Sequence, residues 1–187
     1  APFHGFRECV PAYAALLIRF DPIVTDHDQV ERAALAAMAQ VTAAAVQPVL
    51  REVSVCYDEE FAPDLSAVAE ATGLTAEQVI EAHLSGDYQV FMYGFAPGYA
   101  YLAGVPEPIR LPRKPSAVRG IPAGSVLIAG PQCLVSTLTM PTGWWIIGRS
   151  PTPILTDDPQ RPFLFDVGDR VTFRRISRDR FEAGAGA

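Results

Sequence analysis

One long run of glycines, prolines and aromatic residues, residues 88–149, constrains the fold of this chain more than any other feature. Ten of the 14 glycines lie between residues 86 and 168, and 12 of the 17 prolines lie between residues 97 and 162. Glycine serves where the backbone needs a positive φ or a close approach, and proline serves where φ is fixed. We therefore interpret the run as a shaped surface rather than as a simple core element.

The secondary structure is expected to change character along the chain. Residues 12–20 and 53–57 read as strands, and residues 26–45 read as an Ala-rich helix with apolar residues at helical spacing. After Gly86 the pattern becomes β, with short candidate strands at residues 88–93, 125–129, 134–139, 144–148 and 170–175. Short strands separated by Gly and Pro turns are typical of a barrel or sandwich. The fold class is therefore α+β.

Two short helices separate these regions. Asp64 is a candidate cap for the first helix and Gly73 a candidate residue at its end, while Thr75 and Gln78 have the spacing of a capping box for the second. We place the domain boundary just before these helices. Residues 1–60 are expected to form a small α+β domain, and residues 61–187 a mostly β domain.

Composition excludes several classes of function. The net charge of −6 argues against a nucleic-acid partner, and no apolar run approaches the length of about 20 residues that spans a membrane. The three cysteines are far apart and the three histidines have no ligand spacing, so neither a disulfide framework nor a metal site is expected. A reducing cytoplasm is the simplest compartment for such a chain.

The single lysine, Lys114, decides two further questions about cofactors. It lies in an Arg-Lys-Pro sequence, so the chain has no P-loop. It also lacks the setting of a biotin-carrying lysine on an exposed hairpin turn. ATP remains possible as a cofactor, but ATP or biotin would have to be bound in another way or by a partner.

The chain shows no self-sufficient catalytic set, and its catalytic residues stay unknown at this stage. There is no G-x-S-x-G nucleophile elbow. A Cys133 nucleophile would need a histidine beside it, and we interpret His83 as a hydrogen-bonded core residue. Four cations and no acid lie between Arg110 and Arg119. That cluster fits an acidic small molecule or an acidic partner surface, with a solvated loop as the alternative.

Several ordered motifs resemble those of one family. They are the Gly-Phe-x-Pro-Gly-Tyr-x-Tyr-Leu sequence from Gly94, the Pro-Ala-Gly-Ser-Val sequence from Pro122, and the Gly-Trp-x-x-Ile-Gly-Arg-Ser-Pro sequence from Gly143. Together they closely resemble the allophanate hydrolase subunit 1 family. That family includes the B-type subunit of bacterial 5-oxoprolinase and the sporulation-kinase inhibitor of bacilli, and the same module forms half of the carboxyltransferase domain of urea carboxylase.

The resemblance implies a small α+β amino-terminal domain followed by a cyclophilin-like β-barrel domain. It also implies an additional strand–helix unit before Gly5, and an obligate partner of the subunit 2 type. The substrate site would lie in the barrel groove and at the junction with that partner. Matching positions, with Trp144 added as a wall, form the predicted substrate-binding set: Phe95, Pro97, Gly98, Tyr99, Arg113, Ser125, Gln132, Trp144 and Arg149.

The resemblance favours one function and leaves two others open. The favoured function is subunit 1 of a two-subunit amide or lactam hydrolase that takes a small acidic or amide substrate, with ATP dependence expected. Arg113 and Arg149 would bind carboxylate or phosphate oxygens. The first alternative is a regulatory module of the sensor-kinase-inhibitor type without catalysis, and the second is a cyclophilin-like peptide binder.

The chain departs from the family pattern at three places. They are residues 117–118, 133–136 and 140–142. All three are expected on the groove, so they mark where the specificity of this chain would differ from that of its relatives.

Overall fold

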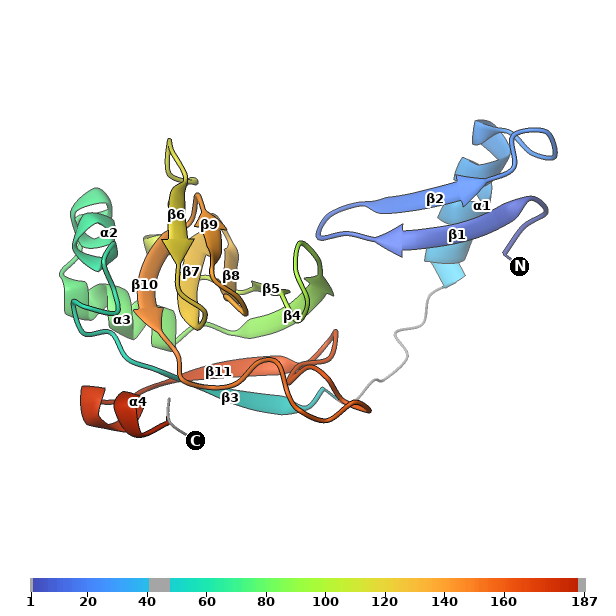
Figure 1. The fold of residues 1–187 in the computed structure, drawn as a ribbon. Helices are drawn as coiled ribbons and strands as arrows, with labels where there is room; N and C mark the ends of the chain where they lie inside the picture. Colours follow the sequence, from blue (N-terminus) through green and yellow to red (C-terminus); the bar gives the residue numbers. More distant parts are fainter. Residues whose placement is uncertain (1, 41–47, 185–187) are drawn as a thin grey trace. The chain divides into compact units, whose positions relative to one another are not determined.

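The computed structural model describes residues 2–40 and 48–184, which form two compact units, Ala1–Gln47 and Pro48–Ala187 (Figure 1). Each unit is described by itself. Among the described residues, no helix is both long and apolar enough to cross a membrane.

The first unit is a β-hairpin with one helix. Strand β1 (Phe6–Pro11) pairs antiparallel with β2 (Leu16–Phe20), and helix α1 spans His27–Gln40. Asp26 caps this helix, because its carboxylate accepts the Gln29 backbone N–H at 2.8 Å. The sequence predicted a strand over residues 12–20, of which β2 is the second part, and it missed β1. The rest of the predicted helix, residues 41–45, lies outside the described residues.

The second unit is built on a seven-stranded sheet. Its strands are β3 (Leu50–Val55), β4 (Tyr88–Tyr93), β5 (Ala100–Ala103), β7 (Ser125–Ala129), β8 (Gln132–Val135), β10 (Trp145–Arg149) and β11 (Arg170–Arg175). They lie in the order β10-β7-β8-β5-β4-β11-β3. An isolated bridge pairs Cys56, just after β3, with Arg149 at the end of β10. The two outer strands of the sheet are therefore joined, and the sheet forms a nearly closed barrel.

The unit boundary in the structure differs from the boundary expected at residue 60. Strand β3 runs parallel to β11 along its whole length, from the pair Leu50–Arg170 to the pair Val55–Arg175. Val53 and Val55 are fully buried in the barrel. The strand expected at residues 53–57 therefore belongs to the barrel, because its partner lies more than a hundred residues away in the sequence and no local signal reveals it.

Apolar residues of the barrel strands pack on both faces of the sheet. Along β7, Val126 and Ile128 join the core inside the barrel, whereas Leu127 and Ala129 join a second cluster on the outer face. This alternation is the two-residue period of a strand. A short ribbon of β6 (Val118–Ile121) and β9 (Met140–Thr142) contributes Ile121 and Met140 to the outer cluster.

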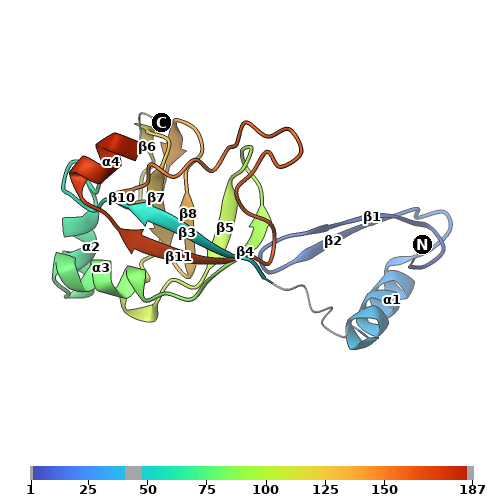
Figure 2. The same ribbon diagram turned by 90° about the horizontal axis from the view of Figure 1, so that it is seen from below.

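Helices pack against the barrel at one end (Figures 1 and 2). They are α2 (Leu65–Thr72), which contacts β10, and α3 (Ala76–Leu84), which contacts β11. The predicted capping box of Thr75 and Gln78 is confirmed, and Gly73 ends α2 in the left-handed conformation at φ +70°. A one-turn helix, η1 (Glu107–Ile109), and helix α4 (Arg178–Gly184) complete the unit.

Candidate functional site

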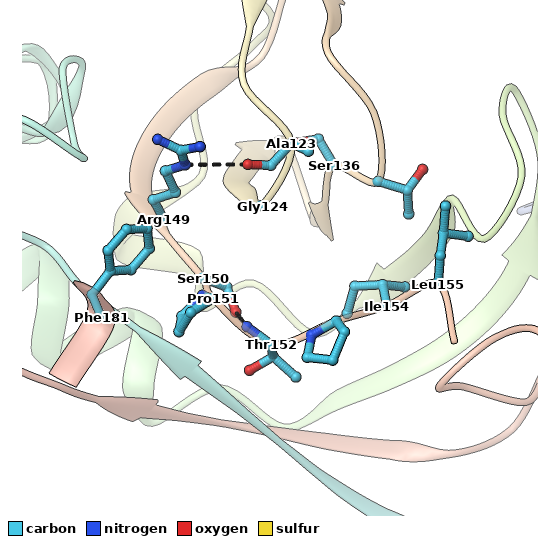
Figure 3. A pocket seen from close by; sticks show the side chains of 12 residues that line it. Ala123, Gly124, Ser136, Arg149, Ser150, Pro151, Thr152, Ile154, Leu155 and Phe181 are labelled. Atoms are coloured by element: carbon cyan, nitrogen blue, oxygen red, sulfur yellow. Dashed lines mark hydrogen bonds between the residues drawn. The ribbon is translucent and has the colours of Figure 1, made fainter. Parts of the chain in front are cut away.

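An open pocket of about 290 Å³ lies beside the end of β10 (Figure 3). Figure 3 shows Arg149 and Phe181 at one end and Leu155 at the other, with Ser136 on one side and Thr152 on the opposite side. The full lining is Ala123, Gly124, Ser136, Thr137, Arg149, Ser150, Pro151, Thr152, Pro153, Ile154, Leu155 and Phe181. The pocket therefore combines one cation with a mostly apolar wall.

A close backbone approach at Gly124 shapes one side of this pocket. Gly124 has a φ of +81°, its N–H donates to the Ser136 carbonyl at 2.7 Å, and its carbonyl accepts the Ser150 N–H at 2.8 Å. A Cβ added at this position would lie 2.3 Å from the Ser150 carbonyl oxygen. Only glycine fits there without movement of the backbone, which explains the glycine within the Pro-Ala-Gly-Ser-Val motif.

Arg149 is fixed in place by its backbone and by one side-chain bond. Its backbone exchanges two hydrogen bonds with Cys56, at 2.8 and 2.9 Å. Its Nε donates to the Ala123 carbonyl at 3.2 Å, and its guanidinium carbon lies 5.6 Å from the centre of the Phe181 ring. Within the described part of the chain, no carboxylate forms an ion pair with Arg149. Its charge is therefore available for an anionic group of a ligand.

Pro97 and Gly98 support the far end of the pocket from behind. The Thr137 hydroxyl donates to the Pro97 carbonyl at 2.8 Å. A Cβ at Gly98, whose φ is +67°, would lie 2.6 Å from the Cδ2 atom of Leu155. The two predicted residues thus position two lining residues, and they are not themselves part of the lining.

Ser125 is buried behind the pocket and not free to react. Its hydroxyl donates to the Pro122 carbonyl at 2.7 Å, and its N–H donates to the Ser136 hydroxyl at 2.9 Å. The Ser136 hydroxyl in turn donates to the same Pro122 carbonyl at 2.9 Å. Both hydroxyls are therefore used to hold the β7–β8 pair.

The remaining aromatic residues of the predicted set, together with Tyr101, form a separate group on the outer face of the barrel. Ring centres of Phe95 and Tyr99 are 5.3 Å apart, those of Tyr99 and Tyr101 are 5.4 Å apart, and those of Tyr101 and Trp144 are 6.0 Å apart. The Arg113 guanidinium carbon lies 5.8 Å from the Trp144 ring centre. Burial raises the pKa of Tyr99, so its hydroxyl stays protonated. We call these five residues the aromatic ladder.

Gln132 belongs to neither group. It pairs with Ala129 and Ala103 in the sheet and does not line the pocket. Among the three departures from the family pattern, the structure places only Ser136 in the pocket lining. Residues 140–142 form β9 in the outer ribbon, and Val118 begins β6 there.

The four cations of the Arg110–Arg119 cluster have different environments. Lys114 is largely buried and pairs with Asp64 at 2.6 Å, and the same Asp64 oxygen accepts the Ile146 N–H at 2.7 Å. The Asp64 side chain therefore holds the loop against β10 rather than capping α2. Arg110 donates its Nε to the Val105 carbonyl at 2.7 Å. Arg113 and Arg119 are exposed and form no ion pair within the described ranges.

A buried chain of polar groups lies inside the barrel. The Tyr57 hydroxyl is 2.7 Å from Nδ1 of His83, and the Cys133 sulfur is 3.6 Å from Nε2 of His83. Burial lowers the pKa of His83 to about 3 and raises the pKa of Cys133. The thiol is thus kept protonated and away from solvent, so the histidine beside it does not make it a nucleophile. The interpretation of His83 as a hydrogen-bonded core residue is confirmed.

Sequence reasoning missed the part of the pocket that follows β10. Residues 152–155 and Phe181 line it, but they lie on a loop and on α4, where no strand or helix pattern marks a site. The Ser-Pro sequence at Ser150 was the only signal in that region. No group of three or more His, Cys, Asp or Glu side chains that could hold a metal occurs in residues 2–40 and 48–184.

Comparison with curated proteins gives relatives that share one name, the B-type subunit of 5-oxoprolinase. The chain is 38% identical over 193 residues to the protein of this name from Bacillus subtilis (strain 168), a match that covers 97% of this chain and 80% of that protein. It is 40% identical over 122 residues to the protein of the same name from Escherichia coli O157:H7. That second match covers 65% of this chain and 56% of the relative.

Solved structures give the same picture of the fold. A conserved uncharacterized protein from Pyrococcus horikoshii matches with a TM-score of 0.68 and 35% identity, over 95% of this chain and 82% of that chain. The urea amidolyase of K. lactis matches with a TM-score of 0.75 over 97% of this chain and 13% of that one. Its identity of 15% makes it evidence for the fold alone.

A family model described as carboxyltransferase domain, subdomain C and D, matches residues 1–165. The match covers most of the chain, and it agrees with the nearly closed barrel and with the relatives named above. This chain therefore belongs to the carboxyltransferase-domain subdomain C and D family.

Proposed function

We propose that this chain is the B-type component of a multi-subunit hydrolase that opens a C–N bond in a small lactam or amide, with 5-oxoproline as the leading substrate. The curated relatives that bear the name of the 5-oxoprolinase B-type component support this proposal. The name of those relatives also implies that further components take part.

The observation that carries the proposal is the unpaired guanidinium of Arg149 at one end of the pocket. A guanidinium binds a carboxylate through two parallel hydrogen bonds. Ile154 and Leu155 give the pocket apolar surface that suits the methylene groups of a small ring. A volume of about 290 Å³ is at the lower limit of drug-sized sites, which run from about 300 Å³, and therefore suits a small acid.

The pocket supplies binding groups but no reactive group of its own. The Ser125 and Ser136 hydroxyls donate to a backbone carbonyl, and the Cys133 thiol is buried with a raised pKa. We therefore propose that the group that attacks the C–N carbonyl comes from a subunit 2-type partner, that the pair is active only together, and that any ATP is bound by that partner. We also propose that the enzyme works in the cytoplasm.

The test measures turnover by the co-expressed pair with 5-oxoproline, allophanate and urea in the presence of ATP. With Arg149→Gln, we expect the KM for 5-oxoproline to rise by about 10-fold to 100-fold, because a charge-assisted hydrogen bond contributes about 1.5–3 kcal/mol. Arg180→Gln is the matched control, since Arg180 is exposed, forms no ion pair within the described residues and lies outside this pocket.

A second readout separates the role of charge from that of shape. Binding of 2-pyrrolidinone, which keeps the lactam ring but lacks the carboxylate, should be weak and insensitive to Arg149→Gln. If Arg149→Gln leaves the KM for 5-oxoproline unchanged, the pocket is not the substrate site. If the pair turns over none of the three compounds and the chain alone binds a sensor kinase, the regulatory alternative replaces the enzymatic one.

A further inference from the structure

Phe95 is exposed in a backbone conformation that phenylalanine rarely adopts. It has a φ of +72°, and no other non-glycine residue of the described chain has a positive φ. The residue is 72% exposed. A bulky residue with positive φ is an outlier, and such outliers persist where the surrounding structure holds them for a function.

The turn that carries Phe95 is held tightly from behind. It joins β4 to β5 (Figure 1) and closes with hydrogen bonds from the Gly94 N–H to the Tyr99 carbonyl at 3.1 Å and from the Tyr99 N–H to the Ala96 carbonyl at 3.1 Å. The close approach of Gly98 to Leu155 fixes its base. The ring is thus presented to solvent on a rigid support, so little conformational entropy is lost when a partner covers it.

The aromatic ladder continues from this turn and ends at a free cation. Tyr99 and Trp144 are each 5% exposed and therefore act as the base of the ladder, while Phe95 and Arg113 are exposed. An exposed aromatic ring and an arginine beside a buried aromatic base are the residue types that dominate binding energy at protein interfaces.

The charge of this part of the chain is opposite to that of the whole. Residues 88–156 contain one acid, Glu107, and five cations, whereas the complete chain has a net charge of −6. Arg113 and Arg119 lie on or near this face without an ion pair among the described residues. A partner that fits this surface would carry carboxylates opposite these arginines.

We propose that Phe95 is the anchor of a docking surface for a different protein chain, which offers an apolar socket with carboxylates at its rim. This inference rests on the proposed function, because the occupant we assign is its subunit 2-type partner. A second copy of this chain is a poorer occupant. It would bring the same free arginines to a symmetric contact, where like charges repel.

The test compares Phe95→Gly with wild type in binding to the subunit 2-type protein of the same genome, measured by isothermal titration calorimetry. Glycine suits a φ of +72°, so the melting temperature should stay equal or rise while the ring is lost. We expect the Kd to increase by about 30-fold or more, which corresponds to an interface hot spot. Val167→Ala is the control, because Val167 is 57% exposed in another loop of the same unit.

Charge is tested with Arg113→Gln at several salt concentrations. The wild-type Kd should increase with salt, and the variant should bind more weakly at low salt with a smaller dependence on salt. These changes should appear in the association rate as well as in the Kd.

Each outcome separates this inference from the proposed function. If Phe95→Gly binds the partner like wild type, or if wild type does not bind it, the docking surface is overturned. If Phe95→Gly assembles normally but its KM for 5-oxoproline rises, Phe95 belongs to the substrate site instead. If the pair assembles through Phe95 but does not turn over 5-oxoproline, the docking surface stands and the proposed function fails.

Discussion

Acid should weaken the barrel through a single buried histidine. His83 is fully buried, and its pKa is lowered from 6.5 to about 3 in the folded chain. Between these two values the unfolded chain binds a proton that the folded chain does not. The free energy of unfolding therefore falls as the pH falls through this window, and the stability from neutral His83 is fully present only above pH 6.5.

The magnitude follows from the two pKa values. One pKa unit corresponds to about 1.4 kcal/mol, so lowering the pH from 7 to 5 should remove about 2 kcal/mol from the free energy of unfolding. The groups around His83 do not titrate in this range, because burial raises the pKa values of Tyr57, Tyr88 and Cys133. The loss should therefore come from the histidine itself.

The assay is urea unfolding at pH 5, 6 and 7, followed by tryptophan fluorescence. Both tryptophans, Trp144 and Trp145, lie in the same unit as His83, so the signal reports the barrel. His83→Gln should be less stable at pH 7 but should lose about 2 kcal/mol less than wild type between pH 7 and 5. Cys133→Ala keeps the histidine and should lose as much as wild type. An equal loss in wild type and His83→Gln would refute the reasoning.

Two further predictions concern stability. Gly124→Ala should lower the free energy of unfolding by about 1–3 kcal/mol or more, because the residue has positive φ and its Cβ would lie 2.3 Å from a carbonyl oxygen. Thermal unfolding should show a smaller loss for Gly130→Ala, whose Cβ meets no atom within 4 Å, and equal losses would contradict the steric explanation. Lys114→Met should cost about 2 kcal/mol in urea unfolding, since it leaves Asp64 largely buried and without its cation. Arg174→Met breaks an exposed pair with Glu52 and should cost at most about 1 kcal/mol, so an equal cost would show that burial is not decisive.

The sequence was most informative where the chain makes local structure. The capping box at Thr75, the C-terminal glycine of α2 at Gly73 and the short strands after Gly86 could all be predicted, because each depends on neighbouring residues. The α+β class and the barrel followed from the strand pattern and from the family motifs. These motifs also contained Arg149 and Gly124, two of the residues that shape the pocket.

The partition of the site could not be predicted, because it depends on contacts between distant segments. Phe95 and Gly98 are three residues apart, yet one projects to solvent and the other packs on Leu155. Asp64 has the position of a helix cap, but the cation of Lys114 and the Ile146 N–H, 50 and 82 residues away, use its carboxylate. In both cases the tertiary structure decides among roles that the local sequence leaves equal.

The bridge between Cys56 and Arg149 places the pocket cation on the seam of the barrel. Two backbone hydrogen bonds join the outer strands there. A ligand that grips the Arg149 guanidinium would therefore also hold the first and last strands of the sheet together. Occupancy of the pocket should slow hydrogen exchange at these two amides, so that the barrel becomes a mechanical reporter of its own ligand.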